Sequence, residues 1–153
     1  MSKIEQKLAD MGFPLPAVAK PVAAYVPSVV TGNLCFTSGQ LPFVDGALPQ
    51  TGKVGRDVTA EDAKDLARLC ALNALAALKL AIGDLDRVTR IVKVVGFVSV
   101  VPEFTAIPGV INGASEFIGE VFGEAGLHAR SSVGVPALPL DSAVELEIIA
   151  EFQ

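Results

Sequence analysis

Histidine and cysteine are both scarce in this sequence, which holds one histidine and two cysteines among 153 residues. Cys35 and Cys70 lie far apart in the chain and His128 stands alone, so the close spacing of zinc or redox ligands is missing. A Ser-His-Asp triad would have to combine His128 with Ser131 or Ser132, which are too near to it in the sequence. Gly-x-Gly-x-x-Gly and Walker patterns are also missing. We therefore expect no metal ion and no cofactor, and we expect both thiols to be free and buried.

Positive charge is also in short supply. The chain has 12 Lys and Arg against 17 Asp and Glu, a formal net charge of −5. Binding to a phosphate backbone normally needs several lysine or arginine contacts, so this balance disfavours nucleic acid as a partner. The N-terminus lacks the apolar core of a signal peptide, and Asn73 and Lys79 interrupt the most apolar stretch. We expect a cytoplasmic protein with no membrane partner.

Apolar residues are abundant, at 51% of the chain against 19% charged residues, which is typical of a folded globular protein. The length predicts one domain over residues 1–153, in which residues 1–20 form a helix and a proline-containing arm. This apolar content is high for a monomer, and it indicates that partner subunits cover part of the surface.

Hydrophobic periodicity and turn residues predict the order of helices and strands along the chain. The predicted elements are a helix at 2–11, a hairpin of strands at 24–30 and 34–40, a helix at 59–82, a strand at 88–100, a helix at 108–123, a strand that starts near Arg130 and a strand at 144–152.

Two of these elements predict how the layers pack. The second half of the helix at 59–82 is apolar nearly all round, so more than one neighbouring element should cover it. The strand at 88–100 is apolar on both faces, with Ile91, Val95 and Phe97 largely on one of them. Two helices can cover the inner face of one sheet, and we expect other subunits to cover the outer face that carries these three side chains.

The last stretch of the chain, residues 128–152, contains the most informative polar side chains. Alternation in the strand at 144–152 places Glu145 and Glu147 on one side of it, opposite an apolar face. Arg130 stands at the start of the preceding strand, before a proline-containing loop. An arginine and a glutamate at strand starts predict a small polar site.

Two motifs make the sequence resemble a known family. Residues 129–139 read Ala-Arg-Ser-Ser-Val-Gly-Val-Pro-Ala-Leu-Pro and are followed by Val-Glu-Leu-Glu-Ile-Ile-Ala, and residues 31–42 read Thr-Gly-Asn-Leu-Cys-Phe-Thr-Ser-Gly-Gln-Leu-Pro. Both blocks, in this order, resemble the signatures of the RidA/YjgF family of enamine and imine deaminases and their relatives. The resemblance implies an α+β fold of chorismate-mutase-like type, with a mixed sheet and two main helices on one face. It also implies a homotrimer with its sites between subunits.

The resemblance also assigns roles to particular residues. Arg130 coincides with the family's ligand for a substrate carboxylate, and Glu145 with the glutamate that positions or activates the attacking water. The remaining positions that match substrate-binding positions of the family are Tyr25 in the N-terminal strand, Ser38, Gly39, Asn112 and Ser132. Ser132 is a departure, because deaminases of the family commonly carry a cysteine there.

These observations lead to two functional hypotheses. The first is a hydrolase that converts reactive 2-imino or enamine acids to 2-oxo acids and ammonia without a bound cofactor. The second is a trimer that binds small carboxylates such as 2-oxo acids without catalysis, which Ser132 favours. A ribonuclease label is sometimes attached to the family, and the acidic charge balance disfavours that activity here.

Overall fold

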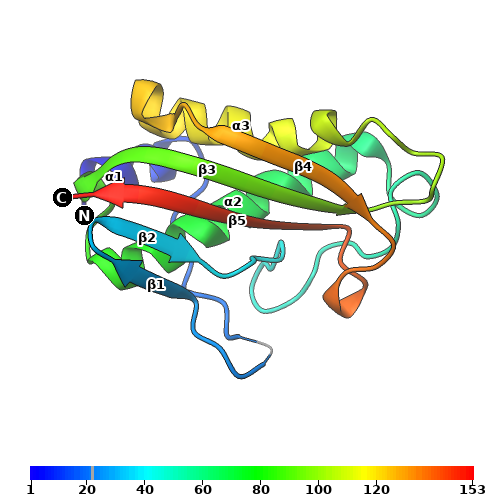
Figure 1. The fold of residues 1–153 in the computed structure, drawn as a ribbon, viewed down its shortest axis with the longest axis horizontal. Helices are drawn as coiled ribbons and strands as arrows, with labels where there is room; N and C mark the ends of the chain where they lie inside the picture. The colour runs from blue at the N-terminus through cyan, green and yellow to red at the C-terminus, as the bar shows by residue number, and fades with distance from the viewer. Residues whose placement is uncertain (22) are drawn as a thin grey trace.

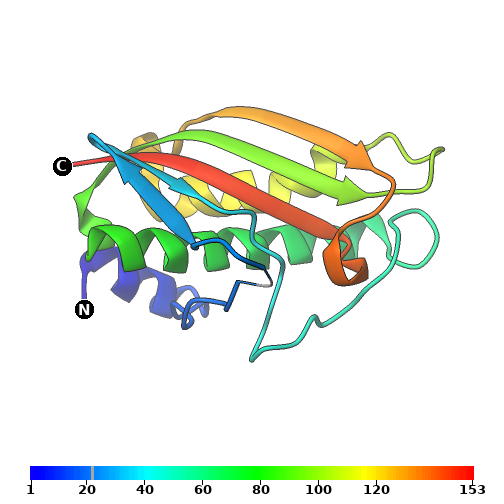
Figure 2. The same cartoon turned by 60° about the horizontal axis from the view of Figure 1, so that its bottom comes forward.

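The chain folds into one mixed sheet with its helices on a single side (Figures 1 and 2). The computed structural model describes residues 1–21 and 23–153. The elements follow the predicted order: α1 (Lys3–Asp10), β1 (Ser28–Thr31), β2 (Leu34–Thr37), α2 (Ala60–Ile82), β3 (Val88–Ser99), α3 (Ile107–Phe122), β4 (Ala129–Val135) and β5 (Val144–Phe152). Short 3-10 turns lie at Leu85–Arg87, Gly123–Gly126 and Pro139–Asp141. The α+β fold class is confirmed.

The strand order across the sheet is β1-β2-β5-β3-β4. The pair β3 and β4 is parallel, and α3 connects these two strands, whereas the other neighbours are antiparallel. The C-terminal strand β5 therefore lies at the centre of the sheet, and β4, which carries Arg130, lies at one edge.

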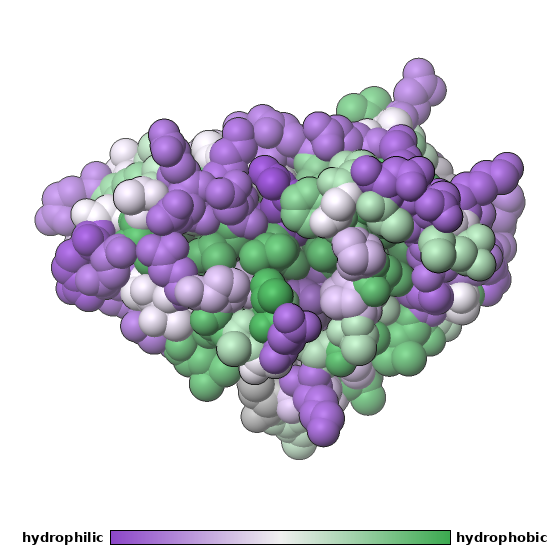
Figure 3. Space-filling view, turned by 180° about the vertical axis from the view of Figure 1, so that it is seen from behind, coloured by the Kyte–Doolittle hydropathy of each residue, from purple (hydrophilic) through white to green (hydrophobic). Residues whose placement is uncertain are grey.

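The two faces of the sheet differ in what covers them. Along β5, Val144, Leu146, Ile148 and Ala150 are buried beneath α2 and α3, as their alternation predicts. The helices lie on this side in Figure 2, and we call it the helix side. Figure 3 shows the molecule from behind the view of Figure 1, which is the helix side. Hydrophilic residues lie along the upper rim of this view and hydrophobic residues lie across its middle. The opposite side, the open face, has no helix over it in the described chain.

A bulge in β3 changes one of the predicted side-chain positions. Ile91 pairs with Ala150, but the next paired residue on β3 is Lys93, opposite Ile149. The extra residue reverses the alternation, so Ile91 is fully buried on the helix side. The prediction that Ile91 lies on the outer face is therefore wrong. Val95 and Phe97 do lie on the open face, where both are half-buried.

The central helix α2 begins and ends where its capping residues predict. The Thr59 hydroxyl accepts a hydrogen bond from the Asp62 N–H, and Gly83 ends the helix with a positive φ of 87°. Residues 71–78 are all buried, because the sheet and α3 pack against different sides of the helix. One of these residues is polar. The Asn73 amide Nδ2 donates to the carbonyl oxygens of Leu41 and Phe43, at 3.0 and 3.1 Å.

The N-terminal part of the sheet is shorter than predicted. Strand β1 starts only at Ser28, because Pro27 has no N–H with which to extend the ladder. The prediction that Tyr25 lies in a strand is therefore wrong, and Tyr25 lies in a bend before β1. The predicted N-terminal helix is confirmed, and Ser2 caps it. Cys35 and Cys70 are free and buried, as expected.

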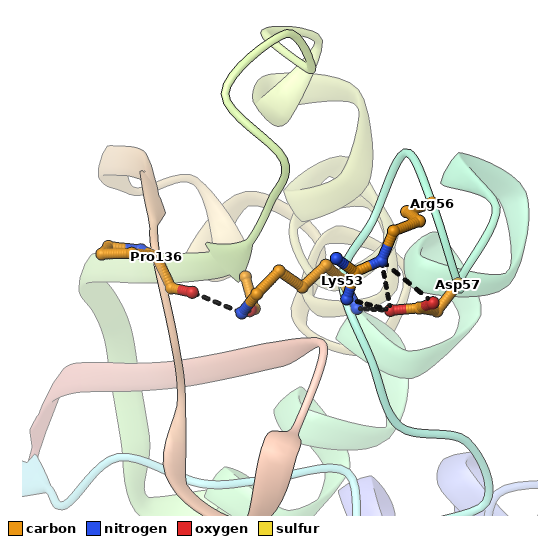
Figure 4. A network of polar contacts seen from close by, with 5 residues as sticks. Lys53, Arg56, Asp57 and Pro136 are labelled. Carbon is orange, nitrogen blue, oxygen red and sulfur yellow. Dashed lines mark hydrogen bonds and ion pairs between the residues drawn. The ribbon is translucent and has the colours of Figure 1, made fainter.

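A lysine fixes the loop that connects the two strands of the C-terminal motif. Lys53 Nζ donates hydrogen bonds to the carbonyl oxygen of Pro136 and, at 3.3 Å, to the hydroxyl of Ser99 (Figure 4). The Asp57 carboxylate in turn accepts from the Lys53 N–H at 2.9 Å and pairs with Arg56. These contacts hold the end of β4 against the loop that precedes α2, and so help to set the path from β4 to β5.

We predict that Asn73→Ala lowers the free energy of unfolding by about 1–3 kcal/mol, because it leaves the carbonyl groups of Leu41 and Phe43 without a donor at a buried position. Urea denaturation followed by circular dichroism measures this change. Leu80→Ala is the control on the same helix, because Leu80 is 62% exposed and its truncation should change stability by less than about 0.5 kcal/mol. Equal stabilities of the two variants would contradict the role assigned to Asn73.

Candidate functional site

The predicted site residues fall into two groups, and the first surrounds Arg130. Arg130 lies beside Val94 of β3, which pairs with Ile148 of β5, so the arginine side chain extends on the helix side. Its Nη1 donates to Asn112 Oδ1 at 2.8 Å and to Ser115 Oγ at 3.2 Å. Its Nη2 donates to the carbonyl oxygen of Pro108 at 3.5 Å. The structure therefore brings Arg130 and Asn112 together.

These contacts leave part of the guanidinium available to a ligand. An arginine has five N–H donors, two on each Nη and one on Nε. Asn112 and Ser115 occupy both donors of Nη1, and Pro108 occupies one of Nη2. Among the described residues nothing accepts from Nε or from the second N–H of Nη2. These adjacent nitrogens can offer two donors to one carboxylate, the pairing that a planar guanidinium favours.

The second group surrounds Glu145. A cavity of about 430 Å³ has this glutamate in its wall together with Tyr25, Ser38 and Gly39. We call it the Glu145 cavity. Sequence reasoning missed its other lining residues, which are mostly apolar: Ala19, Lys20, Pro21, Ala23, Pro27, Gln40, Leu41, Phe43 and Pro139. Most of these residues lie on loops and on the N-terminal arm, where no helical or strand periodicity indicates which side chains face a cavity.

Burial determines the electrostatics of Glu145. Burial, and secondly the neighbouring carboxylate of Glu147, raises the pKa of the Glu145 carboxyl above its ordinary value. In the described part of the chain no group donates a hydrogen bond to this carboxylate. A carboxylate with unused lone pairs and a pKa above its ordinary value is a stronger proton acceptor than a solvent-exposed glutamate.

Ser38 and Gly39 contribute differently to the cavity. The Ser38 hydroxyl donates to the Val26 carbonyl at 2.6 Å and its N–H donates to the Pro27 carbonyl at 2.8 Å. Ser38 can therefore offer a ligand only an oxygen lone pair. Gly39 lies so close to Glu145 that a Cβ at position 39 would be 2.7 Å from Glu145 Oε1. Its N–H has no acceptor among the described residues, so it remains available as a donor.

The two groups do not meet within one chain. Arg130 extends on the helix side of the edge strand β4, whereas Glu145 is opposite Phe97 on the open face of β5, with β3 between the two strands. Ser132 belongs with Arg130, because it pairs with Gly96 two residues further along the same face. The Ser132 hydroxyl is buried and has no hydrogen-bond partner among the described residues. The predicted small polar site that contains both Arg130 and Glu145 is therefore not formed within one chain, and its location between subunits stays a prediction.

The lone histidine contacts a serine that sequence reasoning missed. His128 Nε2 lies 2.9 Å from Ser115 Oγ, and His128 Nδ1 lies 2.6 Å from the carbonyl oxygen of Gly126. The neighbouring serines 131 and 132 are not its partners. The available signal was the spacing of Asn112 and Ser115, which are three residues apart and so share one face of α3.

Two features are missing from residues 1–21 and 23–153. These residues contain no group of three or more His, Cys, Asp or Glu side chains arranged to hold a metal ion. None of their helices is both long enough and apolar enough to cross a membrane.

The sequence matches a family model and several curated proteins. The family model is described as YjgF/chorismate mutase-like, with an endoribonuclease label, and it matches residues 5–152. Protein TCP17 of Trypanosoma cruzi is 43% identical over 150 residues, which cover 97% of this chain and 94% of that protein. The 2-iminobutanoate/2-iminopropanoate deaminase of Escherichia coli is 35% identical over 129 residues, which cover 84% of this chain and 88% of the enzyme.

Solved structures agree with this match. The crystal structure of Atu1372 from Agrobacterium tumefaciens, a protein of unknown function, has a TM-score of 0.92 at 47% identity and covers 98% of this chain and 92% of its own. The crystal structure of Escherichia coli TdcF with bound serine has a TM-score of 0.66 at 28% identity and covers 89% of this chain and 94% of its own. The chain is thus similar over nearly its whole length to one protein of unknown function, and more distantly to one that binds a small amino acid.

We predict that Gly39→Ala destabilises the protein by about 1 kcal/mol, because the added methyl group forces the end of the Glu145 side chain to shift. The same substitution in a Glu145→Ala background should cost much less, because the atoms it meets are gone. The measurement is a double-mutant cycle of unfolding free energies in urea. Equal costs of Gly39→Ala in the two backgrounds would contradict the contact.

Proposed function

The chain belongs to the YjgF/chorismate mutase-like family, and from this membership and its site geometry we propose that it hydrolyses reactive 2-imino and enamine acids to 2-oxo acids and ammonia. The observation that carries the proposal is the Glu145 carboxylate, which lies in a mostly apolar cavity with a raised pKa and no donor from the described chain. A deaminase among the relatives, and a structural neighbour with serine bound, support the same assignment. The reaction needs no cofactor, because a protonated imine is already an electrophile.

Arg130 holds the substrate carboxylate in this proposal. Its two unused N–H groups, on Nε and Nη2, form a bidentate pair with the carboxylate oxygens. Asn112 fixes the guanidinium through Nη1, and so acts on the substrate through Arg130. Ser132 offers a buried hydroxyl on the same face of β4, at the position where deaminases of the family commonly have a cysteine.

Glu145 acts on the water. Its carboxylate takes a proton from a water molecule as the water oxygen forms a bond to C2 of the iminium group, which gives a tetrahedral aminoalcohol. Glu145 then gives this proton to the nitrogen, the C–N bond breaks with its electron pair going to nitrogen, and the C2 carbonyl of the 2-oxo acid forms. The hydroxyl proton of the aminoalcohol passes to the departing ammonia, so the protonated imine yields the 2-oxo acid and ammonium. Atoms and charge balance with one water consumed, and Glu145 returns to its ionised form. The Gly39 N–H and the Tyr25 ring line the same cavity, where they can orient the substrate.

The proposed site requires two subunits. Arg130 and Glu145 extend from opposite faces of the sheet, so one substrate can contact both only if they come from neighbouring chains. A homotrimer, the assembly implied by the family resemblance, would supply these neighbours. Apolar side chains on the open face support an assembly, since Val29, Phe36 and Val133 are 55%, 39% and 44% exposed in the single chain.

We expect purified protein to accelerate the hydrolysis of 2-iminobutanoate generated in situ from an amino acid. Arg130→Ala and Glu145→Gln should each lower kcat/KM on the order of 10²-fold, because one removes the carboxylate clamp and the other removes the base. Arg56→Ala is the matched control, because Arg56 is exposed and its side chain pairs, among the residues that the structure describes, with Asp57 alone.

Two outcomes separate the proposal from its alternative. An Arg130→Ala variant with undiminished kcat/KM would overturn the proposed roles. Calorimetric binding of 2-oxobutanoate that depends on Arg130, with no turnover of any imine tested, would instead identify a carboxylate-binding protein without deaminase activity.

A further inference from the structure

A chain of hydrogen bonds leads from the turn after α3 to the Arg130 guanidinium. The Gly126 carbonyl oxygen lies 2.6 Å from His128 Nδ1, and His128 Nε2 lies 2.9 Å from Ser115 Oγ. Ser115 Oγ in turn accepts from Arg130 Nη1 at 3.2 Å. Both side chains between the carbonyl and the arginine are half-buried.

The chemistry of the partners fixes the direction of every bond in this chain. A carbonyl oxygen can only accept, so His128 Nδ1 must carry the proton that Gly126 receives. In the neutral imidazole the other nitrogen, Nε2, is then an acceptor, and the Ser115 hydroxyl donates to it. With its only proton committed to His128, the Ser115 oxygen presents lone pairs to Arg130 Nη1. Through the tautomer of His128, the Gly126 carbonyl therefore sets the direction of the Ser115 hydroxyl proton, which points away from Arg130.

This arrangement restricts the orientation of the guanidinium. Asn112 Oδ1 and Ser115 Oγ accept the two N–H groups of the same nitrogen, so the guanidinium plane is fixed at that nitrogen by two acceptors. The unused donors on Nε and Nη2 then keep a constant direction. A ligand that meets donors already in place loses less conformational freedom on binding than one that must order a mobile arginine.

We propose that Ser115 and His128 are positioning residues, which hold Arg130 in the orientation that a substrate carboxylate requires. The inference rests on the function proposed above, since it assumes that Arg130 binds that carboxylate. Neither residue touches the substrate, and both act through the Arg130 guanidinium.

Nuclear magnetic resonance tests the bond directions directly, because His128 is the only histidine and its ring ¹⁵N signals need no assignment among several residues. The wild-type protein should show the tautomer with the proton on Nδ1 and an unprotonated, hydrogen-bonded Nε2. In Ser115→Ala the Nε2 signal should move toward that of an unbonded ring nitrogen. A proton on Nε2 in the wild-type protein at neutral pH would overturn the inference whether or not any variant folds.

Kinetics tests the effect on Arg130. Ser115→Ala and His128→Phe should each raise KM for 2-iminobutanoate about tenfold with little change in kcat, because they loosen a group that binds the carboxylate. Ser115→Thr keeps the hydroxyl and should restore KM. Glu116→Gln is the control on the same helix, because Glu116 forms an exposed ion pair with Lys64 and its substitution should leave KM unchanged.

The Arg130→Ala variant distinguishes failure of this inference from failure of the proposed function. If Arg130→Ala has wild-type kinetics, the proposed function itself fails. If Arg130→Ala is impaired while Ser115→Ala and His128→Phe keep the wild-type KM, or lose kcat alone, the positioning role fails and the proposed function stands.

Discussion

The alternation of side chains along β-strands is the constraint on which the account of this site depends. Strand β5 directs Val144, Leu146 and Ile148 toward the helices, and so it must direct Glu145 to the other side. The parallel pairing of β4 with β3 aligns Arg130 with the buried Val94, so both side chains lie on the helix side. A shift of β5 by one residue would bring Glu145 to the face that carries Arg130, but it would expose the core residues of β5. The fold thus places Arg130 and Glu145 on opposite faces of the sheet within each chain. The proposed reaction therefore requires an assembly in which Arg130 of one subunit lies close to Glu145 of another.

Both Arg130 and Glu145 keep hydrogen-bonding capacity that no described residue of the chain uses. Arg130 is held through Nη1 and retains donors on Nε and Nη2, and Glu145 is desolvated while no residue of 1–21 or 23–153 donates a hydrogen bond to its carboxylate. A buried carboxylate with a raised pKa and no hydrogen bond costs folding stability, and such costs concentrate at functional sites. The Gly39 backbone adds to this, because the lack of a side chain lets it approach Glu145 closely. The same features that weaken the isolated fold are the ones that a bound imino acid and an attacking water would satisfy.

Local patterns predicted the elements well, and long-range pairing accounts for what they missed. The helix at Ala60–Ile82 and the strand at Val144–Phe152 carry their own caps or alternation, so their bounds could be predicted closely. Ile91 could not be placed, because the bulge beside it depends on how β3 pairs with β5. Ser115 was missed because its partner His128 returns to α3 only through the turn at Gly123–Gly126. The family resemblance named Arg130 and Glu145, but only the register of the sheet revealed that they face opposite ways.

The most direct measurement of the central claim is subunit complementation. Arg130→Ala and Glu145→Gln subunits, each strongly impaired alone, are co-expressed in equal amounts, and the mixed assemblies are assayed with 2-iminobutanoate. If each site takes Arg130 from one subunit and Glu145 from its neighbour, random mixing restores about one quarter of wild-type activity, because that fraction of interfaces combines the two intact residues. Mixed assemblies that contain both variants and remain as inactive as their parents would contradict a site shared between subunits.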